Sequence, residues 1–184
     1  MTLPIEENKT FVRPNDVVTH FHLKEGDLVA DFGAGSGFFL EPVAKAVGES
    51  GRVFACEIQK VLVDKLGELI NAKNLANVQP LWCDLEELNG INIPSEELDV
   101  ALLINTLFML EDKISAVKEM GRTLRVGGKF FVVDWYESFA GMGPQPEYVV
   151  SQDEAVALFE NHGFVLEREF PSGDHHYGLA FRKI

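Results

Sequence analysis

The stretch DFGAGSG, residues 31–37, decides the fold of this chain. It follows the apolar run LVA at residues 28–30 and precedes FFLEPVAKAVG at residues 38–48, which has helical periodicity. Glycine in a turn costs backbone entropy, so three glycines at alternate positions indicate that something approaches the main chain closely there. The sequence therefore predicts a strand, a tight turn with an open main chain, and a helix in succession.

The composition indicates a soluble globular protein with an acidic surface. Its 184 residues are expected to form one domain, 1–184, with a short helical segment at 1–26 and a substrate flap at 135–150. The net charge of −13 argues against a nucleic acid or an anionic membrane as partner, because both favour a basic surface. Residues 1–14 show no signal pattern and no apolar run is long enough to span a membrane, so we expect a cytoplasmic protein.

The chain contains two cysteines, Cys56 and Cys83. They are too few for a disulfide framework, and their spacing is not that of a usual metal site, so no metal is expected. We expect both thiols to be small buried hydrophobic groups rather than a redox pair.

Predicted strands and helices alternate along the chain. Strands are predicted at residues 28–32, 53–57, 78–83, 98–104 and 129–134, and helices at 15–23, 38–47, 59–73 and 112–124, the last stopped by the RVGG turn. Pro80 weakens the third strand and favours a place near the sheet edge. A capping box of Ser151 and Glu154 begins another helix, and Gly163 stops it. Two closing strands within 164–183 are joined by a turn and are expected to pair antiparallel.

This alternation predicts an α/β fold with a doubly wound parallel sheet and helices on both faces. Ligands of such sheets bind outside the carboxyl ends of the strands, beside the first strand. The glycine turn lies at that end of the first strand, so we expect it to contact the ligand.

The spacing of the glycines distinguishes two classes of nucleotide ligand. A dinucleotide site has the pattern G-x-G-x-x-G, with a helix N-terminus toward a pyrophosphate. Here Gly33, Gly35 and Gly37 form G-x-G-x-G, and Asp31 precedes them. A carboxylate in this place disfavours an anion and favours the ammonium and sulfonium groups of S-adenosylmethionine.

Two more acidic residues end the next two predicted strands. Glu57 ends the second strand, where a carboxylate can accept hydrogen bonds from both ribose hydroxyls. Asp84 follows the third strand, where it can accept a hydrogen bond from the adenine amino group. Three successive strands that end in acidic residues at one edge of a sheet are more specific than a glycine turn alone.

Together these segments resemble a class I S-adenosylmethionine-dependent methyltransferase, with a core similar to the ubiquinone/menaquinone type. The similar segments are VADFGAGSG, VFACEIQ, WCDLEEL, LDVALLINTLFMLED and LRVGGKFFVVDW, most strongly over residues 24–135. The resemblance implies a Rossmann-like seven-stranded sheet of order 3-2-1-4-5-7-6 with strand 7 antiparallel. It also implies S-adenosyl-L-methionine as cofactor and S-adenosyl-L-homocysteine as product.

The resemblance assigns cofactor contacts to residues that follow or end the first four strands. They are Asp31, Gly33, Ala34, Gly35, Gly37, Glu57, Ile58, Asp84, Leu85 and Asn105. Asp31 and the turn would hold the methionine moiety, and Glu57 the ribose. Asp84 would hold the adenine edge, Ile58 would cover an adenine face, and Asn105 would lie under the sulfonium.

Methyl transfer requires alignment of the acceptor and, for some acceptors, removal of a proton. The end of the fifth strand and the beginning of the last strand are expected to meet at the cofactor edge of the sheet. A histidine is the expected proton acceptor, and Asp134 could orient it. The candidate catalytic residues are His175, His176, Asp134 and Tyr136; alternation along the strand lets at most one histidine face a given pocket.

The predicted acceptor pocket combines the N-terminal segment, the turn NTLFML and the flap, with Phe11, Phe108, Trp135 and Tyr177 as lining residues. These residues favour a small, partly apolar acceptor. The N-terminal lid is minimal, so either the site is open or a second subunit helps to close it; a monomer and a homodimer both remain open.

Three other functions compete with methylation of a small molecule. The first is methylation of a protein, or less favourably of RNA. The second is an NAD-dependent oxidoreductase, against which the glycine spacing and Asp31 argue. The third is a binding module for S-adenosylmethionine without turnover.

Overall fold

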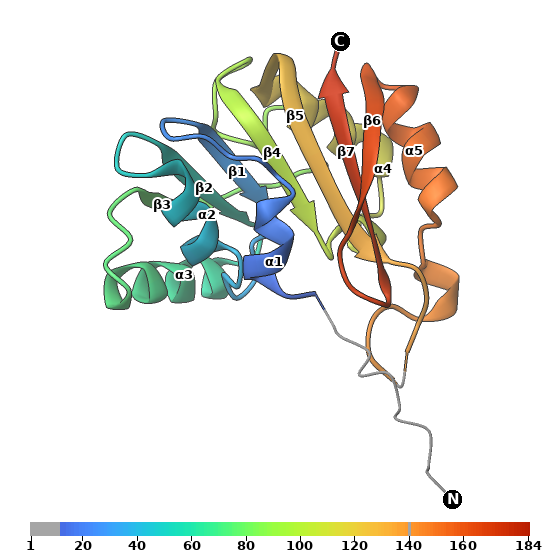
Figure 1. The fold of residues 1–184 in the computed structure, drawn as a ribbon, viewed down its shortest axis with the longest axis horizontal. Coiled ribbons are helices and arrows are strands. Elements are labelled where there is room, and N and C mark those ends of the chain that lie inside the picture. The colour runs from blue at the N-terminus through green and yellow to red at the C-terminus, as the bar shows by residue number, and fades with distance from the viewer. Residues whose placement is uncertain (1–11, 140) are drawn as a thin grey trace, which may run out of the picture.

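A computed structural model of the chain describes residues 12–139 and 141–184 (Figure 1). The helices are α1 (Pro14–Thr19), α2 (Leu40–Val47), α3 (Lys60–Ala72), α4 (Lys113–Thr123) and α5 (Gln152–Glu160). The strands are β1 (Leu28–Phe32), β2 (Arg52–Glu57), β3 (Val78–Trp82), β4 (Leu98–Ile104), β5 (Leu124–Trp135), β6 (Phe164–Pro171) and β7 (His176–Lys183). Two 3-10 turns, η1 (Leu107–Met109) and η2 (Pro146–Tyr148), were not predicted from the sequence.

All seven strands form one sheet of order β3-β2-β1-β4-β5-β7-β6, which confirms the predicted order. Strands β1 to β5 are parallel, and β7 pairs antiparallel with both β5 and β6. Strand β3 lies at one edge of the sheet and has only one neighbouring strand. Pro80, which has no backbone N–H to donate, is tolerated there because no second neighbour needs that hydrogen bond. The carboxyl ends of the parallel strands therefore meet at one edge of the molecule, together with the β6–β7 turn (Figure 1).

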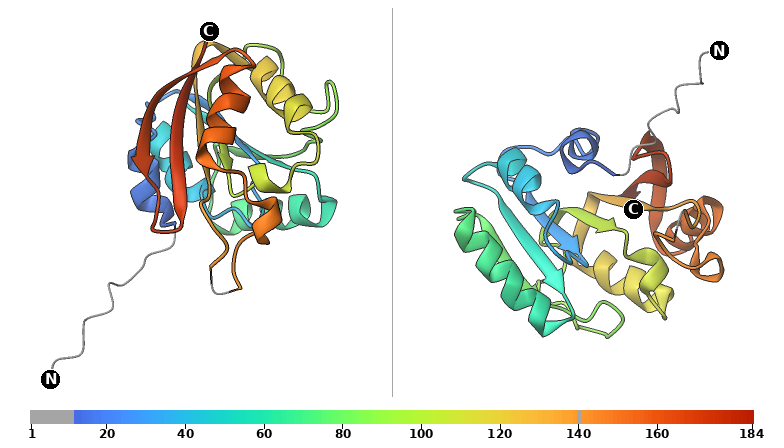
Figure 2. Two further views of the ribbon diagram at one scale, coloured as in Figure 1. Left: turned by 90° about the vertical axis from the view of Figure 1, so that its right-hand side faces the viewer. Right: turned by 90° about the horizontal axis from the view of Figure 1, so that it is seen from below.

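Helices cover both faces of the sheet (Figure 2). Buried side chains of α1, α2 and α3 pack in one apolar cluster with alternate residues of the central strands. Buried side chains of α4 and α5 pack in a second cluster on the opposite face. Since β1 and β4 are buried from both sides, they are continuous apolar runs, as parallel central strands are. No helix among residues 12–139 and 141–184 is long and apolar enough to cross a membrane.

Strand β5 is longer than predicted and begins directly after α4. Leu124 pairs with Leu98, but the next pair joins Lys129 to Val100, so the RVGG segment bulges out of the ladder between them. Gly127 has a φ of 77°, which a side chain would disfavour. The predicted turn is therefore a bulge inside β5, because residues of β4 pair with β5 both before and after it.

The helix α5 begins with the predicted capping box. The Ser151 hydroxyl accepts from the Glu154 amide, and the Glu154 carboxylate accepts from the Ser151 amide. Gly163, with a φ of 87°, then turns the chain into β6. These local signals place α5 directly after η2 and before β6 (Figure 1).

Candidate active site

The glycine turn joins β1 to α2 at the carboxyl edge of the sheet. Gly33, Gly35 and Gly37 have φ angles of 77°, 54° and 80°, which favour glycine. The amides of Gly33 and Ala34 both donate to the Cys56 carbonyl, each at 2.9 Å. The turn is therefore attached to the end of the neighbouring strand β2 as well as to its own strand.

Two of the three glycines allow close packing. A Cβ atom at Gly33 would lie 2.4 Å from Thr106 Oγ1, and one at Gly37 would lie 2.7 Å from Leu69 Cδ2 of α3. At Gly35, by contrast, the nearest heavy atom to such a Cβ is 3.9 Å away. Gly33 and Gly37 thus bring β4 and α3 against the turn, whereas Gly35 leaves open space in front of its main chain.

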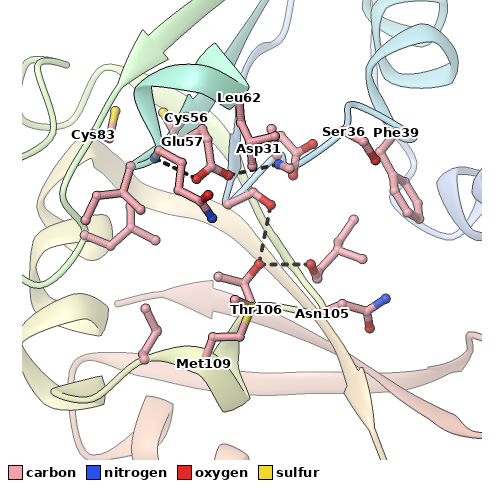
Figure 3. A pocket seen from close by; sticks show the side chains of 18 of the residues that line it. Asp31, Ser36, Phe39, Cys56, Glu57, Leu62, Cys83, Asn105, Thr106 and Met109 are labelled. Carbon is pink, nitrogen blue, oxygen red and sulfur yellow. Dashed lines mark hydrogen bonds between the residues drawn. The ribbon is translucent and has the colours of Figure 1, made fainter. Parts of the chain in front are cut away.

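Glu57 is held in place by two backbone amides. Its Oε2 accepts from Gly35 N at 3.2 Å and its Oε1 accepts from Gln59 N at 2.9 Å (Figure 3). The residue is buried, with 7% of its surface exposed. Each carboxylate oxygen keeps a further lone pair, so the group can still accept two hydrogen bonds from a ligand diol.

Asp31 lies at the end of β1, with 3% of its surface exposed. Burial, together with the nearby Glu57 carboxylate, raises the pKa of Asp31 to about 7. Desolvation and a like charge both disfavour the ionised form. A cation placed between these two carboxylates would reverse both effects, so the pair is a suitable environment for an ammonium group.

The next two strands supply further polar groups. The half-buried Asp84 follows β3 and accepts from the Glu86 amide at 3.1 Å. Asn105 follows β4 with a φ of 53°, and its amide donates to the Val133 carbonyl at 2.8 Å. Asn105 Oδ1 is buried and has no hydrogen-bond partner within the described part of the chain. That oxygen is an acceptor available to a ligand.

These residues surround one cavity of ≈ 380 Å³ (Figure 3). All the predicted cofactor contacts except Gly37 line it. The complete lining is Asp31, Gly33, Ala34, Gly35, Ser36, Phe38, Phe39, Cys56, Glu57, Ile58, Gln59, Leu62, Cys83, Asp84, Leu85, Glu86, Ile104, Asn105, Thr106, Met109 and Leu110.

The charges of this lining identify the kind of ligand. Four carboxylate residues, Asp31, Glu57, Asp84 and Glu86, line the cavity, and no lysine, arginine or histidine of residues 12–139 and 141–184 does so. A dinucleotide pyrophosphate would be repelled there. A nucleoside with an ammonium and a sulfonium fits, since it meets carboxylates, an unpaired Asn105 acceptor and the open main chain at Gly35.

Several lining residues were not among the predicted cofactor contacts, although Met109 belongs to the NTLFML turn predicted for the acceptor pocket. Thr106 donates to the Ile104 carbonyl at 3.0 Å and to the Gly33 carbonyl at 3.5 Å (Figure 3). Phe38 and Met109 are 78% and 62% exposed at the cavity. Thr106 follows directly after Asn105, so its place near the turn could have been inferred; the exposed apolar pair depends on how the loops fold.

The four candidate catalytic residues are brought together, but none of them lines this cavity. The ring of His175 stacks on Phe139, 3.9 Å between ring centroids, and its Nδ1 lies 3.2 Å from a Glu137 oxygen. The ring of His176 lies 4.1 Å from that of Trp135. Burial, with the neighbouring His175, lowers the pKa of His176 to about 4.

Asp134 and Tyr136 also contact the protein itself. Asp134 accepts from Trp135 N at 2.8 Å and from Phe108 N at 3.3 Å, and burial raises its pKa to about 6. The Tyr136 hydroxyl donates to Gln152 Oε1 at 3.0 Å. Asp134 thus holds the turn η1, which follows Asn105 and carries Met109, in place.

The predicted acceptor residues are distributed over different surroundings. Tyr177 is buried in the core and donates to the Val150 carbonyl at 3.1 Å, whereas Trp135 packs on the main chain of Gly143. Phe108 lines a second cavity of ≈ 820 Å³ between η1, η2 and α5, which shares Met109 and Leu110 with the first. Phe11 lies outside the described residues.

Comparison with known proteins agrees with this geometry. Residues 29–128 match the family described as a methyltransferase domain. A ubiquinone/menaquinone biosynthesis C-methyltransferase UbiE from Teredinibacter turnerae is 29% identical over 115 residues, 61% of this chain and 45% of that protein. The chain therefore spans less than half the length of this curated relative.

Solved structures extend the similarity to nearly the whole chain. A SAM-dependent methyltransferase from Aquifex aeolicus superposes with a TM-score of 0.87 at 29% identity, over 95% of this chain and 91% of that one. The [4+2]-cyclase SpnF has a TM-score of 0.77 at 15% identity, over 92% and 80% of the two chains. The latter likeness concerns the fold alone.

The fold and the cavity are those of the class I S-adenosylmethionine-dependent methyltransferases. The chain belongs to the methyltransferase domain family.

The buried Asp31 is expected to reduce the stability of the protein without ligand. Its pKa is about 7 in the folded protein, well above the ordinary range of an aspartate, so the folded state holds the proton more tightly than the unfolded state. The Asp31 carboxyl therefore does not lower the free energy of unfolding below about pH 4. As the pH rises to about 7, it lowers that free energy by a few kcal/mol. In urea unfolding, we expect Asp31→Asn to be more stable than the parent at about pH 8, with little difference at about pH 4.

The exposed Asp64 of α3 provides the matched control, since Asp64→Asn should show no such dependence on pH. A loss of stability in Asp31→Asn at about pH 8 would contradict the assignment.

Proposed function

We propose that this chain transfers the methyl group of S-adenosylmethionine to a small acceptor that is apolar and either neutral or positively charged. The observation that carries the proposal is the cavity at the carboxyl ends of β1 to β4. The described part of the chain lines it with four carboxylate residues and no basic side chain. Exposed apolar side chains of Phe38 and Met109 adjoin it.

The residues of the chain are proposed to bind and orient the two reactants. Asp31 and Asn105 hold the cationic amino-acid part of the cofactor, Glu57 the ribose diol, and Asp84 with Leu85 the adenine edge. When bound, S-adenosylmethionine supplies an already activated methyl group. Alignment alone can then contribute about 7–11 kcal/mol to lowering the barrier, so no further catalytic group is required for a reactive acceptor.

The acceptor class follows from charge and surface. An anionic acceptor would enter a cavity with buried carboxylates and no cation in its lining, and the desolvation of its charge would not be compensated. An apolar acceptor gains about 25 cal/mol for each Å² of apolar surface that it buries, and Phe38, Phe39 and Met109 offer such surface. The similarity to UbiE methyltransferases supports a small acceptor over a macromolecule.

Cofactor binding is expected to depend on Glu57 and on pH. Glu57→Gln should weaken binding of S-adenosylhomocysteine about tenfold or more, because a charge-assisted hydrogen bond contributes about 1.5–3 kcal/mol. Affinity should also rise with pH through about 7, as Asp31 ionises. Titration calorimetry measures both, and the exposed Glu49→Gln is the control. Unchanged affinity in Glu57→Gln, or preference for NAD, would contradict the proposal.

The acceptor is sought with S-adenosylmethionine labelled in its methyl group. Incubation with a metabolite extract should label a low-mass compound that partitions into organic solvent at neutral or alkaline pH. Label in protein or RNA instead would establish the macromolecular alternative. Cofactor binding with no labelled product at all would favour a binding module without turnover.

The catalytic roles of His175, His176, Asp134 and Tyr136 stay predictions, and their contacts favour positioning of the segment 136–150. His176→Phe keeps a ring against Trp135 and removes both nitrogens, so we expect the rate of label transfer to stay within about fivefold. Tyr136→Phe should behave alike. A fall of about a hundredfold with unchanged cofactor affinity would instead assign proton transfer to the altered residue.

A further inference from the structure

Two thiols meet in the wall of the cofactor cavity. Cys56 is the last residue but one of β2, and Cys83 follows directly after β3. In the parallel ladder Cys56 pairs with Leu81, so Cys83, two residues further on, lies on the same face of the sheet. Both sulfur atoms appear at one side of the cavity in Figure 3, and both residues line it.

The two thiols are close enough to influence each other's ionisation. Hydrogen bonding between them lowers the pKa of Cys83 and raises that of Cys56. A backbone hydrogen bond from Asn92 further lowers the pKa of Cys83. Both residues are almost fully buried, at 0% and 1% exposed, so a reagent reaches them through the cavity that they line.

We propose that Cys56 and Cys83 are a redox modification site: a hydroperoxide joins them in a reversible disulfide, and bound cofactor protects them. The formation of the bond stands on the position of the two residues, which lie on one face of neighbouring strands in the wall of one cavity. Its link to the cofactor rests on the proposed function, because it requires that the cavity holds S-adenosylmethionine.

The chemistry balances with hydrogen peroxide as the two-electron oxidant. The Cys83 thiolate attacks one peroxide oxygen, the O–O bond breaks, and Cys83 becomes a sulfenic acid while the second oxygen leaves as water after protonation. Cys56 sulfur then attacks the Cys83 sulfur, the S–O bond breaks, and the proton of Cys56 leaves with that oxygen as water. Two thiols and one peroxide thus give one disulfide and two waters, and a dithiol restores both thiols.

The position of the two residues connects their oxidation to cofactor binding. The Cys56 carbonyl accepts from the amides of Gly33 and Ala34, and the Cys83 amide donates to the Glu57 carbonyl at 3.0 Å. Closing a hydrogen-bonded pair of sulfurs to covalent distance moves both strand ends. That movement displaces the glycine turn and the segment that carries Asp84, so the oxidised protein is expected to bind cofactor more weakly.

The same link acts in both directions. If oxidation weakens cofactor affinity by some factor, bound cofactor disfavours the disulfide by the same factor. The pair would then stay reduced in protein that holds cofactor and be oxidised in protein that does not.

The 184-residue chain contains no other cysteine, which allows a direct test. After treatment with hydrogen peroxide, intact-mass measurement should show the loss of two hydrogens, and a non-reducing digest should show a peptide that joins Cys56 to Cys83. Saturating S-adenosylhomocysteine should slow this reaction about fivefold or more, and calorimetry should show a similar loss of affinity in the oxidised protein. Dithiothreitol should reverse both.

Serine variants give the matched controls. Cys56→Ser should stop at a Cys83 sulfenic acid that dimedone traps. Cys83→Ser should react more slowly, because burial and the Asp31 carboxylate still disfavour the thiolate of Cys56. Retention of two free thiols after peroxide, or a disulfide between molecules only, would overturn the modification site. Suppose that calorimetry shows binding of S-adenosylhomocysteine, but the disulfide within one molecule forms at the same rate with and without it. That result would overturn the link between oxidation and cofactor binding. Absence of binding would instead contradict the proposed function.

Discussion

The attachment of the glycine turn to the end of β2 is the constraint on which the rest of the site depends. Amides of Gly33 and Ala34 donate to the Cys56 carbonyl, and the Gly35 amide donates to the Glu57 carboxylate. The backbone at the end of β1 thereby fixes the side chain of Glu57 at the end of β2. Gly33 and Gly35 present their amides with φ angles of 77° and 54°, which favour glycine at both positions.

The same arrangement places two carboxylates where water cannot fully solvate them. Asp31 is buried beside Glu57, and its pKa is raised because the ionised form loses solvation and meets a like charge. Such a carboxylate destabilises the folded protein when no ligand is bound, and it stabilises the complex with a cationic ligand. Stability and binding are therefore opposed at this position, which is a property of functional sites and not of cores.

The fold indicates which cofactor binds more closely than it indicates which reaction follows. A [4+2]-cyclase shares this architecture at 15% identity, so the sheet and its order do not by themselves identify a chemistry. In this chain exposed Phe38 and Met109 lie beside buried acidic residues at the cavity. Under the proposed function, these loops select the acceptor while the strand ends hold the cofactor.

The sequence by itself determined the elements, their order through a family resemblance, and the acidic edge of the sheet. These depend on local periodicity, on glycine spacing and on residues at strand ends, which a parallel sheet gathers at one edge. Tertiary structure decided the rest: the bulge in β5, the contact between Cys56 and Cys83, and the separation of His176 from the cofactor cavity. Those features depend on side chains that meet across strands and loops distant in the sequence, and no local pattern encodes such contacts.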